Sequence, residues 1–192
     1  MKIGIAAENR RGEKRAIIQP SEMKKLAARH EVIVGNGVGL GIDIPDEAYI
    51  KVGCKVGSRE EVYGCELVIR IKEPSFEEIK MMRSGTIIMA MMHIRCRPKL
   101  DEALHNQKLI AIPLENLKDT VGRRKVEAVE DSGRIGMEYG FKLLGKDPAT
   151  ATVKIMGYGN IAMGAIRCAA RKFAKVQILN KKNLLEMDKH IP

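Results

Sequence analysis

The distribution of hydrophobic and polar positions along the chain predicts alternating strands and helices. Short apolar runs rich in Ile and Val recur between segments whose apolar residues follow a helical period. Several runs contain no polar residue, as is typical of parallel strands that helices cover on both faces. We therefore expect an α/β fold over residues 1–125, with a doubly wound parallel sheet of the flavodoxin or Rossmann type. The predicted strands occupy residues 2–6, 31–35, 67–71, 86–92 and 108–112.

Helix-start signals stand in three of the segments between these runs. Ser21 follows Pro20 at the start of one segment, and Pro98 suits the first turn of another. Ser58 and Glu61 have the spacing of a capping box. Each helix would return the chain through a right-handed crossover to the next parallel strand.

A longer helix is predicted from about residue 125 to residue 144, with a stop signal at Gly145. We interpret residues 126–148 as a connecting helix and loop. The predicted apolar face of this helix comprises Val126, Val129, Ile135, Tyr139 and Leu143.

The last part of the chain repeats the strand, helix, strand pattern. Strands are predicted at 152–156 and 175–179, with a helix over 165–173 between them. We interpret residues 149–192 as the beginning of a Rossmann dinucleotide-binding domain, and we expect this domain to be incomplete because little chain follows the second strand.

The turn between the first strand and the helix has the pattern G-x-G-x-x-A. Its first glycine permits a tight turn, its second lets the backbone approach a pyrophosphate, and its small third residue allows close packing. The N-terminus of the following helix would offer N–H groups to the phosphates. A tight turn that binds nothing is the alternative. The residues predicted to contact a dinucleotide are Gly157, Gly159, Asn160, Ile161 and Ala162.

Residues at the tip of the second strand bear on the choice of cofactor. NAD-specific domains usually hold an acid there for the ribose 2′-hydroxyl, whereas this chain has Asn180 followed by Lys181 and Lys182. An amide with cations suits a 2′-phosphate, so NADP is favoured and NAD remains the alternative. The lysines could equally be solvated surface charges.

Three cationic residues follow predicted strands or lie in the loops after them: Arg15, Lys72 and His93. Ligands of open parallel sheets bind beyond the carboxyl ends of the strands, so these side chains could converge on one anion. Arg grips a carboxylate in bidentate fashion, Lys supplies a point charge, and His exchanges a proton near neutral pH. Alternatively, Arg15 belongs to a surface charge run, Lys72 pairs with Glu73, and His93 caps a strand.

Composition narrows the possible functions. Lys and Arg outnumber Asp and Glu by 34 to 24, but the excess is scattered, and four Tyr, three Phe and no Trp would serve base stacking poorly. Nucleic-acid binding is therefore disfavoured. The apolar runs are too short to span a membrane, and the opening lacks the order of a secretory signal, so we expect a cytoplasmic protein. Four scattered cysteines indicate neither a metal site nor a disulfide framework.

Ordered sequence blocks carry a family resemblance over nearly the whole chain. They include MKIGI, then E-x-R-A-I-I-Q-P with Glu13 and Arg15, then HEVIVGNGVGLG, ELVIRIKEP and MMHIR. In this order the blocks resemble the N-terminal domain shared by alanine dehydrogenases and proton-translocating transhydrogenases. The resemblance implies a substrate domain that binds a 2-oxo acid and a Rossmann domain that presents nicotinamide. It also implies that Arg15 and Lys72 hold the substrate, that His93 acts as acid and base, and that the protein is a homo-oligomer.

Later segments depart from alanine dehydrogenases. The stretch that ends in KIMGYGNIAMGA is similar to N5-(carboxyethyl)ornithine synthases, relatives that use NADPH. Val129 stands where the family usually has a serine that touches the cofactor, and the family's catalytic aspartate lies downstream of this chain. We therefore expect an amino-acid dehydrogenase or carboxyalkyl amino-acid synthase, or a fragment of one, acting on a 2-oxo acid or amino acid. The alternative is a non-catalytic module that binds small carboxylates.

Overall fold

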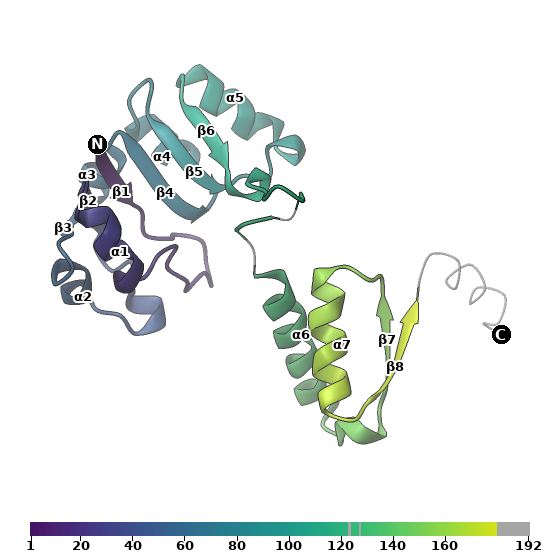
Figure 1. The fold of residues 1–192 in the computed structure, drawn as a ribbon. Helices are drawn as coiled ribbons and strands as arrows, with labels where there is room; N and C mark the ends of the chain where they lie inside the picture. Colours follow the sequence, from purple (N-terminus) through teal and green to yellow (C-terminus); the bar gives the residue numbers. More distant parts are fainter. Residues whose placement is uncertain (123, 127, 180–192) are drawn as a thin grey trace. The chain divides into compact units, whose positions relative to one another are not determined.

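The computed structural model describes residues 1–122, 124–126 and 128–179. The chain divides into two compact units, residues 1–126 and 127–192, which are described separately (Figure 1). Within the described residues, no helix has both the length and the apolar character needed to cross a bilayer.

Unit 1 is built on a six-stranded sheet in the order β3-β2-β1-β4-β5-β6. Every neighbouring pair is parallel, which confirms the predicted parallel α/β sheet. The order runs in opposite directions from β1 and from β4, so the two halves diverge at a switch point between these strands. The strands are β1 (Lys2–Ile5), β2 (Glu31–Gly35), β3 (Lys55–Gly57), β4 (Leu67–Lys72), β5 (Ile87–Met91) and β6 (Ile110–Pro113).

The helices of unit 1 start where the local signals predict. Pro20 and Pro98 lie in the first turns of their helices, and Ser58 forms its capping box with Glu61. Ser75 forms a second box of the same spacing, which the prediction overlooked. Two further short elements, β3 and α2, had no strong periodic signal. The helices are α1 (Pro20–Ala27), α2 (Asp46–Ile50), α3 (Arg59–Tyr63), α4 (Phe76–Met81) and α5 (Pro98–Asn106).

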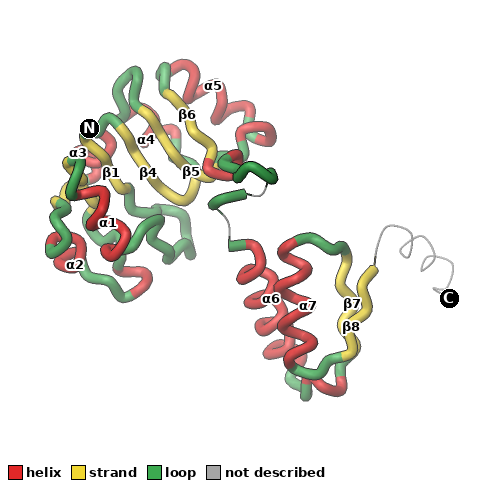
Figure 2. Tube along the Cα trace, in the orientation of Figure 1, coloured by secondary structure: helices red, strands yellow, loops and turns green. Residues whose placement is uncertain are grey.

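Helices surround this sheet (Figure 2). Two apolar clusters cover its opposite faces. Val32 and Val34 belong to one cluster and Ile33 to the other, because consecutive strand residues point to opposite faces. Met23 of α1 and Tyr49 of α2 join the first cluster, while α3, α4 and α5 contribute to the second. Burial on both faces explains why the strands are nearly continuous apolar runs.

The described part of unit 2 contains two parallel strands and two α-helices. The helix α7 lies between α6 and the strands (Figure 1). Helix α7 begins at Asn160, five residues before the predicted start, because the residues after Gly159 are already helical. The elements are α6 (Val129–Leu144), β7 (Thr152–Met156), α7 (Asn160–Arg171) and β8 (Lys175–Leu179).

The predicted apolar face of α6 is wrong. Ile135, Tyr139 and Leu143 are 55%, 60% and 69% exposed, whereas Gly133 and Phe141 are buried. At Gly133 the helix lies so close to α7 that a Cβ there would collide with the backbone of α7. The helix does end at Gly145, as predicted, in a left-handed conformation with φ of 64°.

Candidate functional site

The end of β4 is tied to the loop after β1 by the carboxylate of Glu8. A bulge between Ile69 and Lys72 interrupts the pairing of β4 with β5. The backbone N–H groups of Ile71 and Lys72 donate to Glu8, with the shortest contact 2.6 Å from Ile71 N to Glu8 Oε1. Glu8 therefore holds the segment that carries Lys72 at the switch point of the sheet.

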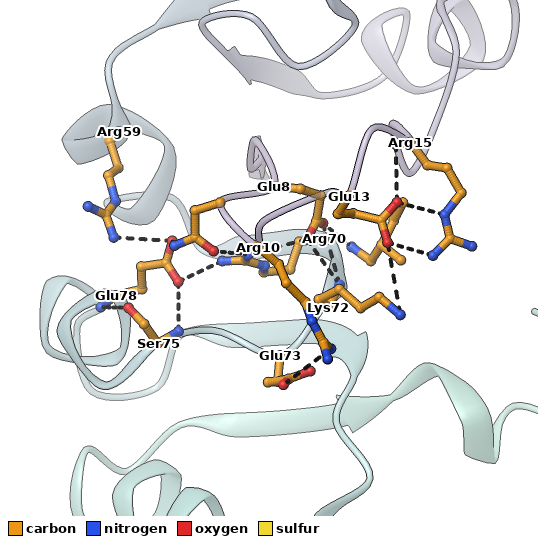
Figure 3. Close-up of polar contacts among 12 residues, drawn as sticks. Glu8, Arg10, Glu13, Arg15, Arg59, Arg70, Lys72, Glu73, Ser75 and Glu78 are labelled. Atoms are coloured by element: carbon orange, nitrogen blue, oxygen red, sulfur yellow. Dashed lines mark hydrogen bonds and ion pairs between the residues drawn. The ribbon is translucent and has the colours of Figure 1, made fainter. Parts of the chain in front are cut away.

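The buried guanidinium of Arg70 contacts the same loop after β1 (Figure 3). Arg70 is fully buried, and its Nη1 donates to Tyr63 Oη at 2.6 Å and to Glu78 Oε2 at 2.7 Å. Its Nη2 donates to Glu8 at 3.3 Å and to Asn9 Oδ1 at 3.2 Å. The network joins the loop after β1 to α3, β4 and α4. Sequence reasoning missed it, although a lone arginine inside an apolar strand was a usable signal.

Arg15 and Lys72 meet at the carboxylate of Glu13. Arg15 holds Glu13 in bidentate fashion, with Nε at 2.7 Å from Oε1 and Nη2 at 2.6 Å from Oε2. Lys72 Nζ lies 3.9 Å from the same Oε2. The hydrogen bond from Arg15 lowers the pKa of Glu13 to about 2, so this carboxylate is charged at neutral pH. Arg15, Lys72 and Glu13 together carry one net positive charge, and the carboxylate of Glu8 also lies near Arg15 and Lys72.

His93 follows β5 in a left-handed conformation, with φ of 49° and ψ of 44°. Its backbone N–H donates to Glu115 Oε1 at 2.6 Å, and its Nδ1 lies 3.9 Å from the same oxygen. Burial acts to raise the pKa of Glu115. Hydrogen bonds from backbone N–H groups, including those of His93 and Met92, have the larger effect, so the pKa of Glu115 is lowered from its ordinary value. Because Met91 pairs with Lys72, His93 stands at the same edge of the sheet as Lys72.

An open pocket of about 890 Å³ adjoins Lys72. Its wall is formed by three segments, residues 9–10, 72–76 and 96–100, and it includes neither Arg15 nor His93. The carboxylate of Glu73 accepts a hydrogen bond from Arg97 and lies 3.9 Å from Arg10 Nη1. Glu73 is therefore engaged by arginines, while the ammonium of Lys72 is directed to Glu13.

The predicted dinucleotide turn lies in unit 2. Gly157 has φ of 94°, and its N–H donates to Leu179 O at 2.9 Å, so the turn uses a conformation that favours glycine. Gly159 is the N-cap residue of α7, and residues 159–162 line a hollow of about 460 Å³ together with Val129. A Cβ added to either glycine would meet no atom of the described residues within 4 Å, which leaves room for a ligand to approach the backbone. Asn180 and Lys181 lie outside the described residues, as does Lys182.

Neither metal ligation nor disulfide bonding contributes to the part of the chain that is described. No group of three or more His, Cys, Asp or Glu side chains there could hold a metal ion. Cys54, Cys65, Cys96 and Cys168 are free thiols.

The chain is similar to a known protein family and to several of its members. The family model for the alanine dehydrogenase/PNT N-terminal domain matches residues 4–135. Alanine dehydrogenase from Bilophila wadsworthia is 30% identical, over 94% of this chain and 52% of its own. The enzyme from Methanococcus maripaludis is also 30% identical, over 98% of this chain and 56% of its own. A solved structure of L-alanine dehydrogenase superposes with a TM-score of 0.83 at 25% identity, covering 98% of this chain and 58% of that one. The chain thus spans about half the length of the curated relatives it matches.

Proposed function

Because the chain belongs to the alanine dehydrogenase/PNT N-terminal domain family, we propose that it forms the substrate-binding part of an NAD(P)-dependent amino-acid dehydrogenase. The substrate would be a 2-oxo acid or the corresponding amino acid. The observation that carries the proposal is the convergence of Arg15 and Lys72 on one oxygen of Glu13. Their net positive charge complements a single substrate carboxylate.

Each residue of this group has a role that its chemistry suits. Arg15 would bind the substrate carboxylate through the guanidinium edge that Glu13 does not occupy, and Lys72 would lie against the carbonyl oxygen or imine nitrogen. His93 would give a proton to that heteroatom as the carbon is reduced, and would take one in the reverse direction. Glu115 would position His93, since it accepts the hydrogen bond of the His93 backbone N–H, and its Oε1 lies 3.9 Å from Nδ1. A bound nicotinamide dinucleotide supplies or accepts the hydride.

The hollow at the start of α7 supports dinucleotide binding. Gly157 and Gly159 leave their backbone open to a pyrophosphate. Asn160, Ile161 and Ala162 line the hollow and belong to the first turn of α7. Asn180 and Lys181 favour NADP over NAD on sequence grounds. We also propose that the protein is a homo-oligomer, as the family resemblance implies. Its free thiols suit a reducing compartment such as the cytoplasm.

Titration of the protein with pyruvate, in which the heat of binding is measured by calorimetry, tests the substrate site. Arg15→Ala is expected to weaken binding by about tenfold or more, because it removes a charge-assisted contact. Arg11→Ala is the matched control, since it deletes an exposed arginine of the same loop. His93→Ala should retain pyruvate binding, because its role lies in proton transfer. Equal binding by the wild-type chain and Arg15→Ala would rule out the proposed site.

A second function is supported by the location of the anion site entirely within unit 1. A module that binds small carboxylates without catalysis would need only this unit. The two functions separate when NADPH is added with pyruvate and ammonium. Binding of NADPH that pyruvate strengthens supports the dehydrogenase part, whereas pyruvate binding with no nucleotide binding supports the module.

A further inference from the structure

The pocket next to Lys72 is larger than a three-carbon substrate requires. Its volume of about 890 Å³ falls within the ~300–1,000 Å³ that small-molecule sites usually occupy. Lys72 is shared with the proposed substrate group, so a molecule held at Arg15 and Lys72 could extend into this space. The lining of the pocket therefore bears on the part of the substrate beyond the reacting carbon.

Positive charge dominates the polar lining of this pocket. Four cations, Arg10, Lys72, Arg97 and Lys99, face it with only one carboxylate, that of Glu73. Arg97 donates to Glu73 through Nη1, and among the described residues its Nε and Nη2 have no protein acceptor. Lys99 makes no ion pair with any described residue.

Glu73 fixes the geometry of these cations. Its side chain is 19% exposed and its Oε1 is shared by Arg97 and Arg10, which lie on segments far apart in sequence. A guanidinium held on one edge by a carboxylate presents its remaining N–H groups in a defined direction, which lowers the entropy cost of binding an anion. Glu73 therefore restrains Arg97, and the Nε and Nη2 groups of Arg97 are available to an anion in the pocket.

Apolar side chains also line the pocket. They belong to Pro74, Phe76, Pro98 and Leu100, and Asn9 and Ser75 add uncharged polar groups. Phe76 is 53% exposed, and a ligand lying against its ring would reduce this exposure. A pocket lined by several cations and by apolar side chains suits a molecule that combines anionic groups with methylene groups.

We propose that this pocket receives a second anionic group of the substrate, so that the preferred ligand is a dicarboxylic 2-oxo acid or its amino acid. The inference rests on the proposed function, because it takes Arg15 and Lys72 as the site of the first carboxylate. Arg97 and Lys99 bind the distal carboxylate, and Phe76 contacts the intervening chain.

Competing ligands test the inference on the 192-residue chain. Affinities for pyruvate, 2-oxohexanoate and 2-oxoglutarate are measured by calorimetry, because these acids separate chain length from distal charge. The wild-type chain should bind 2-oxoglutarate about tenfold or more tightly than pyruvate, as expected for one added charge-assisted contact. 2-Oxohexanoate should fall well short of 2-oxoglutarate.

Two variants and a control localise the effect. Lys99→Ala and Arg97→Gln should each lower the ratio of 2-oxoglutarate to pyruvate affinity, and the double variant should bring that ratio near one. Arg95→Ala is the matched control, since this exposed arginine precedes the same segment but does not line the pocket. Lys99 is exposed, so its variant preserves the test if Arg97→Gln fails to fold.

The outcomes distinguish the two levels of the proposal. Arg15-dependent binding of pyruvate with no preference for 2-oxoglutarate would overturn the second anion site and leave the proposed function standing. Equal binding of 2-oxohexanoate and 2-oxoglutarate, or an equal effect of Arg95→Ala and Lys99→Ala, would also overturn it. Failure of every oxo acid to bind would remove the proposed function together with the inference.

Discussion

Arg70 shows how a single buried charge can organise a corner of the fold. Removing a guanidinium from water carries a cost of several kcal/mol, which its partners must offset. Here Glu78 and Glu8 supply opposite charge, and Tyr63 and Asn9 accept two further hydrogen bonds. The Nε of Arg70 is buried without a partner among the described residues. Because Glu8 also holds the backbone of Lys72, the buried network positions the proposed substrate site.

Loss of this guanidinium should be costly. Arg70→Ala is expected to lower the free energy of unfolding by about 3–5 kcal/mol, because Glu8 would lose its cation and Glu78 would keep only the partly exposed Arg59. Arg134→Ala serves as the control. It removes an exposed arginine that pairs with Glu138 on α6, and should cost less than about 1 kcal/mol. Urea denaturation measures both, and similar losses would contradict the role given to the network.

At the scale of elements, glycine decides how α6 meets α7. A Cβ at Gly133 would lie 1.8 Å from Ile161 O, and one at Gly164 would lie 1.8 Å from Glu130 O. Each helix therefore presents a glycine to the backbone of the other. By contrast, a Cβ at Gly136 of α6 would have no atom of the described chain within 4 Å. Glycines of the same helix thus have opposite structural roles.

Alanine substitutions should separate these roles. Gly133→Ala is expected to destabilise unit 2 by roughly 1–3 kcal/mol or more, because backbone must move to admit the methyl group. Gly136→Ala should instead stabilise it by about 0.5–1 kcal/mol through helix propensity. Thermal unfolding followed by circular dichroism measures the difference. A stabilising Gly133→Ala would show that the helices are not packed as described.

At the scale of the whole molecule, unit 1 concentrates the carboxylates whose ionisation is coupled to folding. Burial opposes the ionisation of Glu78 and Glu115, but backbone N–H donors and nearby cations still lower the pKa of both below 4.5. The Arg15 guanidinium lowers the pKa of Glu13 to about 2. A carboxyl with a lowered pKa in the folded state stabilises the fold above its unfolded pKa, and this contribution is lost as the pH falls.

Acid should therefore weaken unit 1. We expect its free energy of unfolding to fall as the pH decreases from 4.5 toward about 2, the range between the ordinary and folded pKa values of Glu13. Urea titrations at a series of pH values measure this fall. Glu13→Gln should make it shallower, because the amide does not titrate. Stability that stays constant over this range, or a slope unchanged in Glu13→Gln, would refute the coupling.

Local sequence determined which segments form strands and where helices begin and end. The apolar runs became β1, β2, β4, β5 and β6, and the signals at Pro20, Ser58, Pro98 and Gly145 all mark helix boundaries. These features depend on side-chain period and on hydrogen bonds within a few residues, so they can be read along the chain.

Only the tertiary structure decided which distant residues meet. Strand order brings Glu8 to Arg70 across 62 positions, and it puts the carboxyl ends of β4 and β5 at one edge. The roles of Arg15, Lys72 and His93 remain predictions, but the contacts of Arg15 and Lys72 with Glu13 needed the fold. The buried face of α6 also depended on its partner helix, since glycine allowed a close approach that apolar periodicity does not reveal. Such choices depend on shape and charge across long separations, which no local pattern encodes.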